Sequence, residues 1–263
     1  MEEKNPFKLV SSKKTRLILP NLLTLIGVCL GISSIKFSLD QNYSLAVIFL
    51  IFAAILDTLD GRIARLIKGT SEFGKELDSL TDFVSFGIAP AFILYFWELK
   101  NYGKIGWAIT LIFSVCCVLR LARFNLTKIS EEAEWKRNYF EGIPSPAGAI
   151  LILLPLIYEL SELQFNIDIK KFTPYLVVTV AVLLISNIPT FSLKKIKISS
   201  QLTIFLLLGI VVIFVSLIFF TFKALLVLGL LYLMSIPASY FLYKRTNKKL
   251  SKMSKGIDHE DIL

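Results

Sequence analysis

Long apolar segments, separated by short polar ones, repeat along almost the whole chain. We identify eight of them, at about residues 17–37, 43–66, 78–97, 105–126, 145–160, 174–191, 201–220 and 222–243. A helix of about 20 apolar residues spans the hydrocarbon core of a bilayer. The pattern therefore predicts an all-α, polytopic membrane helix bundle with about eight transmembrane helices.

Two places in this pattern are less regular. The fifth segment is short and contains Pro155, so the pattern does not fix where its helix begins and ends. The last two segments have almost no polar residue between them, which predicts a tight hairpin near Thr221 to Lys223.

Composition and charge agree with a membrane protein. Hydrophobic residues make up 55% of the chain, and the formal net charge is +9. The basic residues gather between apolar segments and no nucleic-acid-binding motif accompanies them, so they indicate membrane topology and anionic lipid. Most of them fall on the side that holds both termini. The positive-inside rule predicts that this side is cytoplasmic.

Four aspartates gather at the same side of the membrane. Asp57 and Asp60 are three residues apart at the end of the second segment, and Asp78 and Asp82 are four apart at the start of the third. Each spacing places both carboxylates on one helix face. A short connection containing glycine allows the helices to turn back on each other, so we expect the four carboxylates to converge.

Converging carboxylates repel one another unless cations join them. Oxygen-only ligands suit Mg²⁺ or Mn²⁺ better than Zn²⁺, and two such ions can clamp the attacking and leaving oxygens of a phosphoryl displacement. Gly61 and Ala64 leave room for a phosphate or base beside the helix, and Arg65 can neutralise a phosphate. The alternative is a set of solvated charges that end two helices, but it does not account for the joint spacing.

The whole run reads Asp57-x2-Asp60-Gly61-x2-Ala64-Arg65-x8-Gly74-x3-Asp78-x3-Asp82. It resembles the signature of the CDP-alcohol phosphotransferase family at every fixed position. The resemblance implies a CDP-linked substrate, a hydroxyl acceptor and two divalent cations, Mg²⁺ or Mn²⁺. It implies that Asp57, Asp60, Asp78 and Asp82 hold metal, with Asp82 also the general base, and that Gly61, Ala64, Arg65 and Gly74 shape the nucleotide site.

The same resemblance organises the chain around a six-helix core. That core covers residues 17–191, and two extra transmembrane helices occupy 192–243. Residues 1–16 form a basic segment whose mixed pattern is typical of an interfacial helix or a basic tail, and residues 244–263 form a basic tail that we expect to be disordered. The family also implies a homodimer, for which the sequence itself gives no dimerisation motif.

Further stretches resemble the phosphatidylserine synthase branch of the family. They are SEFGKELDSLTDFVSFGIAPA, RLARFN and FEGIPSPAGA, which begin at Ser71, Arg120 and Phe140. The stretch PNLLT resembles the start of the family's first helix, where Asn21 and Thr24 face the nucleotide. The implied substrates are CDP-diacylglycerol, drawn from the membrane lipids, and L-serine.

An L-serine pocket needs a cation for the carboxylate and polar groups for the rest. Arg120 and Arg123 lie where the fourth segment meets the cytoplasm, and either can bind the serine carboxylate or the diphosphate. Asn125 can orient the acceptor, and Ser145 lies at a helix entry that can donate to an anion. The alternatives are membrane anchoring for the arginines and an N-cap for Ser145.

Three other functions stay open at this point. A sister enzyme would use glycerol 3-phosphate or an inositol phosphate, whose extra phosphate needs more cation near Arg120 and Arg123. A cation-coupled transporter would place its acids near the midplane and in matching halves, which this sequence does not do. A scaffold protein would give the aspartate spacing no role.

Overall fold

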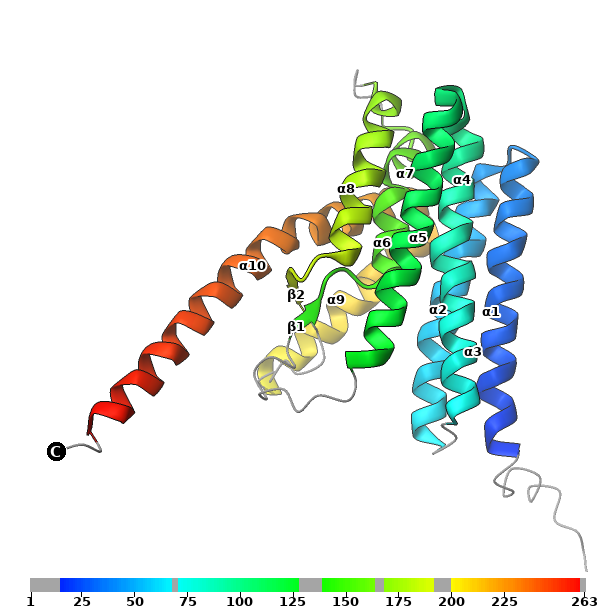
Figure 1. The fold of residues 1–263 in the computed structure, drawn as a ribbon. Coiled ribbons are helices and arrows are strands. Elements are labelled where there is room, and N and C mark those ends of the chain that lie inside the picture. Colours follow the sequence, from blue (N-terminus) through cyan, green and yellow to red (C-terminus); the bar gives the residue numbers. More distant parts are fainter. Residues whose placement is uncertain (1–14, 68–70, 128–138, 164–167, 192–199, 261–263) are drawn as a thin grey trace, which may run out of the picture.

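The computed structural model describes residues 15–67, 71–127, 139–163, 168–191 and 200–260, and nearly all of them are helical (Figure 1). The first half comprises α1 (Thr15–Leu39), α2 (Tyr43–Leu66), α3 (Glu72–Asp82), α4 (Ala89–Trp97) and α5 (Gly103–Thr127). The second half comprises α6 (Ser145–Ile152), α7 (Leu154–Leu160), α8 (Thr173–Ile185), α9 (Ser200–Phe219) and α10 (Thr221–Glu260). The predicted all-α bundle is confirmed.

One small sheet interrupts the helices. Strand β1 (Tyr139–Glu141) pairs antiparallel with β2 (Pro189–Phe191), with Phe140 opposite Thr190. The pairing brings the chain entering α6 against the chain leaving α8. The sequence does not predict this sheet, because a strand of three residues is too short to show an alternation of apolar and polar residues.

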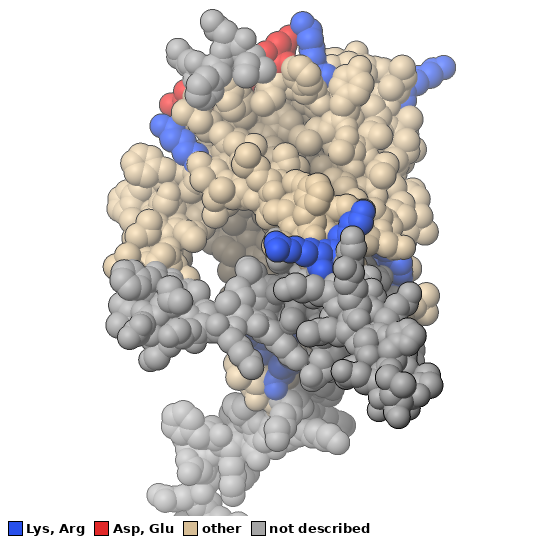
Figure 2. Space-filling view, turned by 90° about the vertical axis from the view of Figure 1, so that its left-hand side faces the viewer, with Lys and Arg blue, Asp and Glu red and all other residues tan. Residues whose placement is uncertain are grey.

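Within the described residues, five helices are long and apolar enough to cross a membrane. They cover Ile18–Leu39, Tyr43–Leu66, Glu72–Trp97, Leu99–Leu126 and Thr221–Arg245. Figure 2 shows Lys and Arg side chains at two levels on one face, with a broad uncharged belt between them. These helices indicate a protein that spans a membrane several times. The count of eight crossings stays a prediction, since α9 offers only the shorter apolar stretch Leu207–Phe219.

The fifth apolar segment forms the centre of the bundle. The fifth is broken at Leu153 into α6 and α7, because Pro155 lacks the N–H that a continuous helix would use. Leu151, Ile152, Leu156 and Ile157 are all at most 1% exposed. These residues therefore pack against protein on every side and hold the surrounding helices in place.

The helix that carries Asp78 and Asp82 begins before the apolar segment that we predicted at residues 78–97. Helix α3 starts at Glu72 and not near residue 78, and Ser71 caps it by accepting a hydrogen bond from the Gly74 N–H at 2.9 Å. Its first turns are amphipathic, so a search for apolar residues misses them. A π-helical stretch, η2 (Phe83–Ile88), then joins α3 to α4, and the Ala89 N–H bonds to the Val84 carbonyl.

The C-terminal helices differ from expectation in one respect. The tight hairpin is confirmed, since α9 ends at Phe219 and α10 begins at Thr221. Helix α10 then leaves the bundle obliquely (Figure 1) and continues to Glu260, whereas we expected disorder from residue 244 onward. The basic stretch contains no proline and many lysines, which continue a helix readily. The predicted interfacial segment 1–16 lies almost entirely outside the described residues.

Candidate active site

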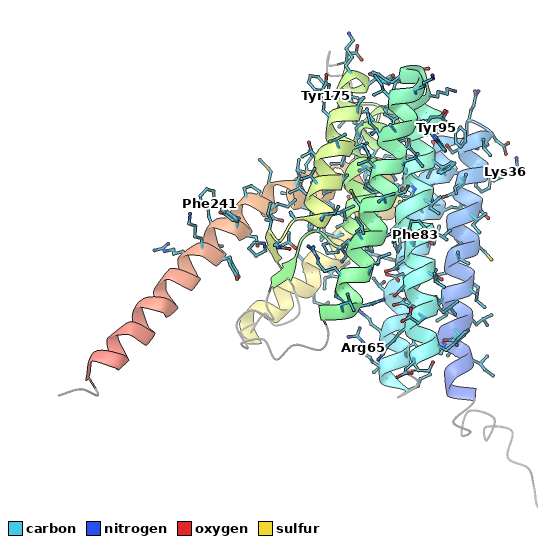
Figure 3. All side chains as sticks on the ribbon, viewed as in Figure 1. Lys36, Arg65, Phe83, Tyr95, Tyr175 and Phe241 are labelled. Carbon is cyan, nitrogen blue, oxygen red and sulfur yellow. The ribbon has the colours of Figure 1, made fainter. Side chains whose placement is uncertain are left out.

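The aspartates of α2 and α3 meet as their spacing predicts. Asp57 and Asp60 lie one turn apart near the end of α2, and Asp78 faces them from α3. One carboxylate oxygen from each lies within 4.8 Å of the other two. Arg65 and Phe83, labelled in Figure 3, mark the level of this cluster, which is at the opposite end of α1 and α2 from Lys36.

Asp82 completes the group from the last position of α3. It is close enough to Asp57 for the charge of one carboxylate to act on the other. Its Oδ1 atom is buried and has no hydrogen-bond partner among the described residues. The π-helix η2 begins at the next residue, and π-helical turns occur frequently at functional sites. A buried carboxylate oxygen that has no partner is available to a ligand.

Helix α1 supports this cluster from the side. The Thr24 Oγ1 atom lies 2.6 Å from Asp60 Oδ2, and Asp60 is only 3% exposed. A hydroxyl that donates to a carboxylate makes a strong hydrogen bond and fixes the carboxylate orientation. We predicted Thr24 as a nucleotide contact, but its hydroxyl is engaged by Asp60. In the structure this hydroxyl orients Asp60, and its contact with the nucleotide stays a prediction.

Asn21 and Gly74 mark the closest approach of α1 and α3. A Cβ atom added at Gly74 would lie 3.1 Å from Asn21 Oδ1 and 3.1 Å from Ser71 Oγ. A larger residue there would push on both side chains. The two predicted nucleotide-site residues are therefore neighbours, and Gly74 also keeps α3 close to α1.

The other predicted nucleotide-site residues follow the aspartates on α2. A Cβ atom added at Gly61 would meet nothing within 4 Å, so the helix is open there. Ala64 is partly buried, and the exposed Arg65 donates from Nε to the Gly61 carbonyl at 2.9 Å. This open surface agrees with the space that we predicted for a nucleotide, although its role as a binding site stays a prediction.

Arg120 and Ser145 are brought together beside the aspartates. Arg120 is 9% exposed on α5 and donates from Nη1 to Ser145 Oγ at the first residue of α6. The charge of Arg120 also acts on Asp82. Asn125, one turn further along α5, donates to Ser79 Oγ at 3.0 Å and so links α5 to α3. These three predicted residues all border the aspartate cluster.

Arg123, near the end of α5, contacts the end of a neighbouring helix. Its guanidinium donates to the carbonyls of Ile185 at 2.6 Å and Ser186 at 3.1 Å, and to Asn187 Oδ1 at 2.8 Å. These groups lie at the C-terminal end of α8, where backbone carbonyls have no partners within the helix. Arg123 caps α8, and its binding of acceptor or phosphate stays a prediction.

Replacing Arg123 with alanine should therefore reduce stability more than binding. Loss of several hydrogen bonds from a charged donor should lower the Tm by about 5 °C. Thermal unfolding in detergent measures this, and Lys104→Ala, at the exposed start of the same helix, is the control. An unchanged Tm with a raised acceptor KM would restore the predicted binding role.

Sequence reasoning missed two side chains near Arg120. Cys117 on α5 is fully buried, one turn before Arg120 on the same helix. Tyr232 on α10 interacts with both Thr190 and Arg120. Neither residue belongs to a motif, and Tyr232 lies in an apolar segment of otherwise generic sequence. The single signal was a phenolic hydroxyl inside a membrane helix, which needs a polar partner.

Comparisons with known proteins agree with this site. The CDP-alcohol phosphatidyltransferase family model matches residues 17–185. The CDP-diacylglycerol–serine O-phosphatidyltransferase of Mycobacterium leprae is 42% identical over 176 residues, which are 65% of this chain and 57% of that enzyme. The enzyme of the same name from Helicobacter pylori is 37% identical over 202 residues, or 77% of this chain and 81% of that enzyme.

A third relative of the same name, from Bacillus subtilis, is 35% identical over 142 residues, which are 54% of this chain and 77% of that enzyme. The match spans less than two thirds of the mycobacterial relatives' own length, between 57% and 60%. The family model covers most of the chain and includes every aspartate of the cluster. The chain therefore belongs to the CDP-alcohol phosphatidyltransferase family.

Proposed function

We propose that the protein transfers a phosphatidyl group from CDP-diacylglycerol to the hydroxyl of L-serine, forming phosphatidylserine and CMP. The observation that carries this proposal is the convergence of Asp57 and Asp60 of α2 with Asp78 of α3. The names of the three relatives support serine as the acceptor.

The carboxylates fit divalent cations on two grounds. Three aspartates bring an all-oxygen donor set within 4.8 Å, which suits Mg²⁺ or Mn²⁺. The buried Oδ1 of Asp82 has no partner in the described part of the chain. Asp57, Asp60 and Asp78 would hold two such ions, with Asp82 at their edge and Thr24 fixing Asp60. When bound, the cations supply positive charge that neutralises the diphosphate and the departing CMP.

Asp82 is the residue that we assign as general base. It accepts the proton of the serine hydroxyl as the serine oxygen forms a bond to the lipid-side phosphorus. The bond between that phosphorus and the CMP oxygen breaks, and its electron pair leaves with CMP. The buried Oδ1 atom of Asp82 has no hydrogen-bond partner among the described residues and is therefore free to accept this proton.

Arg120 is the cation that we assign to the acceptor pocket. It is buried next to Asp82, and Ser145 holds one of its terminal nitrogens. A fixed guanidinium recognises a carboxylate with defined geometry. The positive-inside distribution of Lys and Arg supports a pocket that opens to the cytoplasm, where L-serine is drawn from solution.

Purified protein in detergent tests this proposal directly. With CDP-diacylglycerol, L-serine and Mg²⁺ or Mn²⁺, we expect phosphatidylserine and CMP in equal amounts, and a chelator should stop both. CMP release with glycerol 3-phosphate or an inositol phosphate, but not with serine, would assign the chain to a sister enzyme. Absence of CMP release with every acceptor would contradict a transferase and favour the transporter alternative.

A further inference from the structure

Two polar atoms on different helices, α5 and α10, have no hydrogen-bond partner among the described residues. They are Nε of Arg120 and the hydroxyl oxygen of Tyr232, and both are buried. Arg120 is 9% exposed, and its charge interacts with the Tyr232 hydroxyl. Leaving two such donors without an acceptor is costly in a membrane protein. The pair therefore points to a ligand that supplies the acceptor.

Packing of α10 fixes where Tyr232 lies. About one turn before it, a Cβ atom added at Gly229 would lie 2.5 Å from Leu154 Cδ2, so this helix touches α7 closely. Two turns after it, Ser239 is fully buried and donates to the Pro189 carbonyl of β2 at 2.7 Å. The helix is held on both sides of Tyr232, which orients its side chain toward the bundle.

The surroundings of the Tyr232 ring and of its hydroxyl differ. The ring lines a cavity of about 200 Å³, whose other lining residues are apolar residues of α6 and α10. These residues offer nothing to the hydroxyl. Beside the hydroxyl lie Arg120 and Thr190, and Thr190 already donates its own proton to the Gly142 carbonyl at 2.7 Å. The tyrosine thus joins an apolar surface to a polar site.

The missing acceptor is best supplied by an anion. Arg120 gives the site a positive charge, and its Nη1 is occupied by Ser145 while its Nε is not. A carboxylate oxygen accepts from N–H and O–H donors together. Helix α10 also lies outside residues 17–185, the region matched by the family model. The acceptor differs between family members, whereas the nucleotide is common to them. A residue outside the common region is therefore better placed to recognise the acceptor than the nucleotide.

We infer that Tyr232 is a specificity-determining residue, whose hydroxyl donates with Arg120 Nε to the anionic group of the acceptor. The inference rests on the proposed function in one point, that the acceptor is L-serine and the anion is its carboxylate. It extends the active site to α10, a helix that the aspartate motif does not reach.

Tyr232→Phe tests the inference, because it keeps the ring in the apolar cavity and removes only the hydroxyl. We expect the KM for L-serine to rise about tenfold, with kcat and the KM for CDP-diacylglycerol changed less than about twofold. The matched control is Tyr240→Phe, a more exposed tyrosine on the same helix. Thermal unfolding of both variants shows whether the bundle is intact.

Each outcome has a separate meaning. An unchanged KM for serine in a folded, active Tyr232→Phe variant overturns the inference and leaves the proposed function intact. A higher KM for CDP-diacylglycerol alone also overturns it, since the anion is then the diphosphate. If the wild type uses glycerol 3-phosphate and not serine, the proposed function fails. A raised KM for that acceptor in Tyr232→Phe would still support the inference.

Discussion

Replacing Asp82 with asparagine is expected to lower kcat by about 10²- to 10⁴-fold, because the variant has no group to accept the serine proton. Asparagine has nearly the same shape as aspartate, so the helix and the neighbouring Asp57 should stay in place. Steady-state rates of CMP release with saturating serine and lipid measure the effect. Binding of Mn²⁺ to the same sample should persist, since Asp57, Asp60 and Asp78 remain.

Asp40→Asn is the matched control for that experiment. Asp40 is an exposed aspartate at the other end of α1, where it pairs with Lys36 at 2.6 Å. An exposed pair of this kind contributes little to stability, and it is far from the cluster. We expect near-normal turnover from this variant. Near-normal turnover from Asp82→Asn with metal still bound would instead remove Asp82 from its role as base.

Replacing Asp57 with alanine should abolish metal-dependent activity and at the same time remove a source of repulsion. Without metal, the wild-type cluster holds several carboxylates within a few ångströms, and removing one relieves like-charge contact. In chelator, the Tm of Asp57→Ala should therefore equal or exceed that of the wild type. A ligand that binds only the folded state raises its stability, so added Mg²⁺ should raise the wild-type Tm alone.

Two measurements on the same samples check whether the order of the two Tm values, wild type and Asp57→Ala, reverses when Mg²⁺ replaces chelator. Thermal unfolding is recorded in chelator and in excess Mg²⁺, and CMP release is recorded in Mg²⁺. Asp40→Asn serves again as control and should gain the same Mg²⁺ stabilisation as the wild type. A metal-induced rise in Tm that survives in Asp57→Ala would show that Asp57 is not a ligand.

Much of the fold follows from short-range patterns in the sequence. The ends of α2, the hairpin at Phe220 and the convergence of the two aspartate pairs all rest on apolar length and on helical spacing, which are local properties. The break between α6 and α7 needed knowledge of packing as well, since Pro155 alone did not say that both halves are buried. The helical course of residues 244–260 was missed because composition alone does not separate a basic helix from a basic tail.

The site was predictable where residues lie on neighbouring helical turns, and less so where they meet across the bundle. Asp57, Asp60 and Asp78 were placed correctly by spacing. Arg120 and Arg123 look equivalent in sequence, yet one reaches Ser145 and the other caps α8. Only the position of α8 separates them, and β-strand pairing after that helix sets it. Tyr232 depends on the contact between α10 and β2, which no local pattern encodes.

The π-helix between Asp82 and Ala89 has a consequence for how this protein tolerates mutation. A π-turn accommodates one more residue than an α-turn, so the chain after it is rotated by about 100° relative to a straight α-helix. Helix α3, which carries Asp78 and Asp82, and helix α4 therefore present their side chains at different angles about the common helix axis. Mutations that change the packing of α4 can therefore accumulate without turning the aspartates of α3 away from α2. Deletion of one residue from η2 would instead rotate α3 and α4 relative to each other and misalign both.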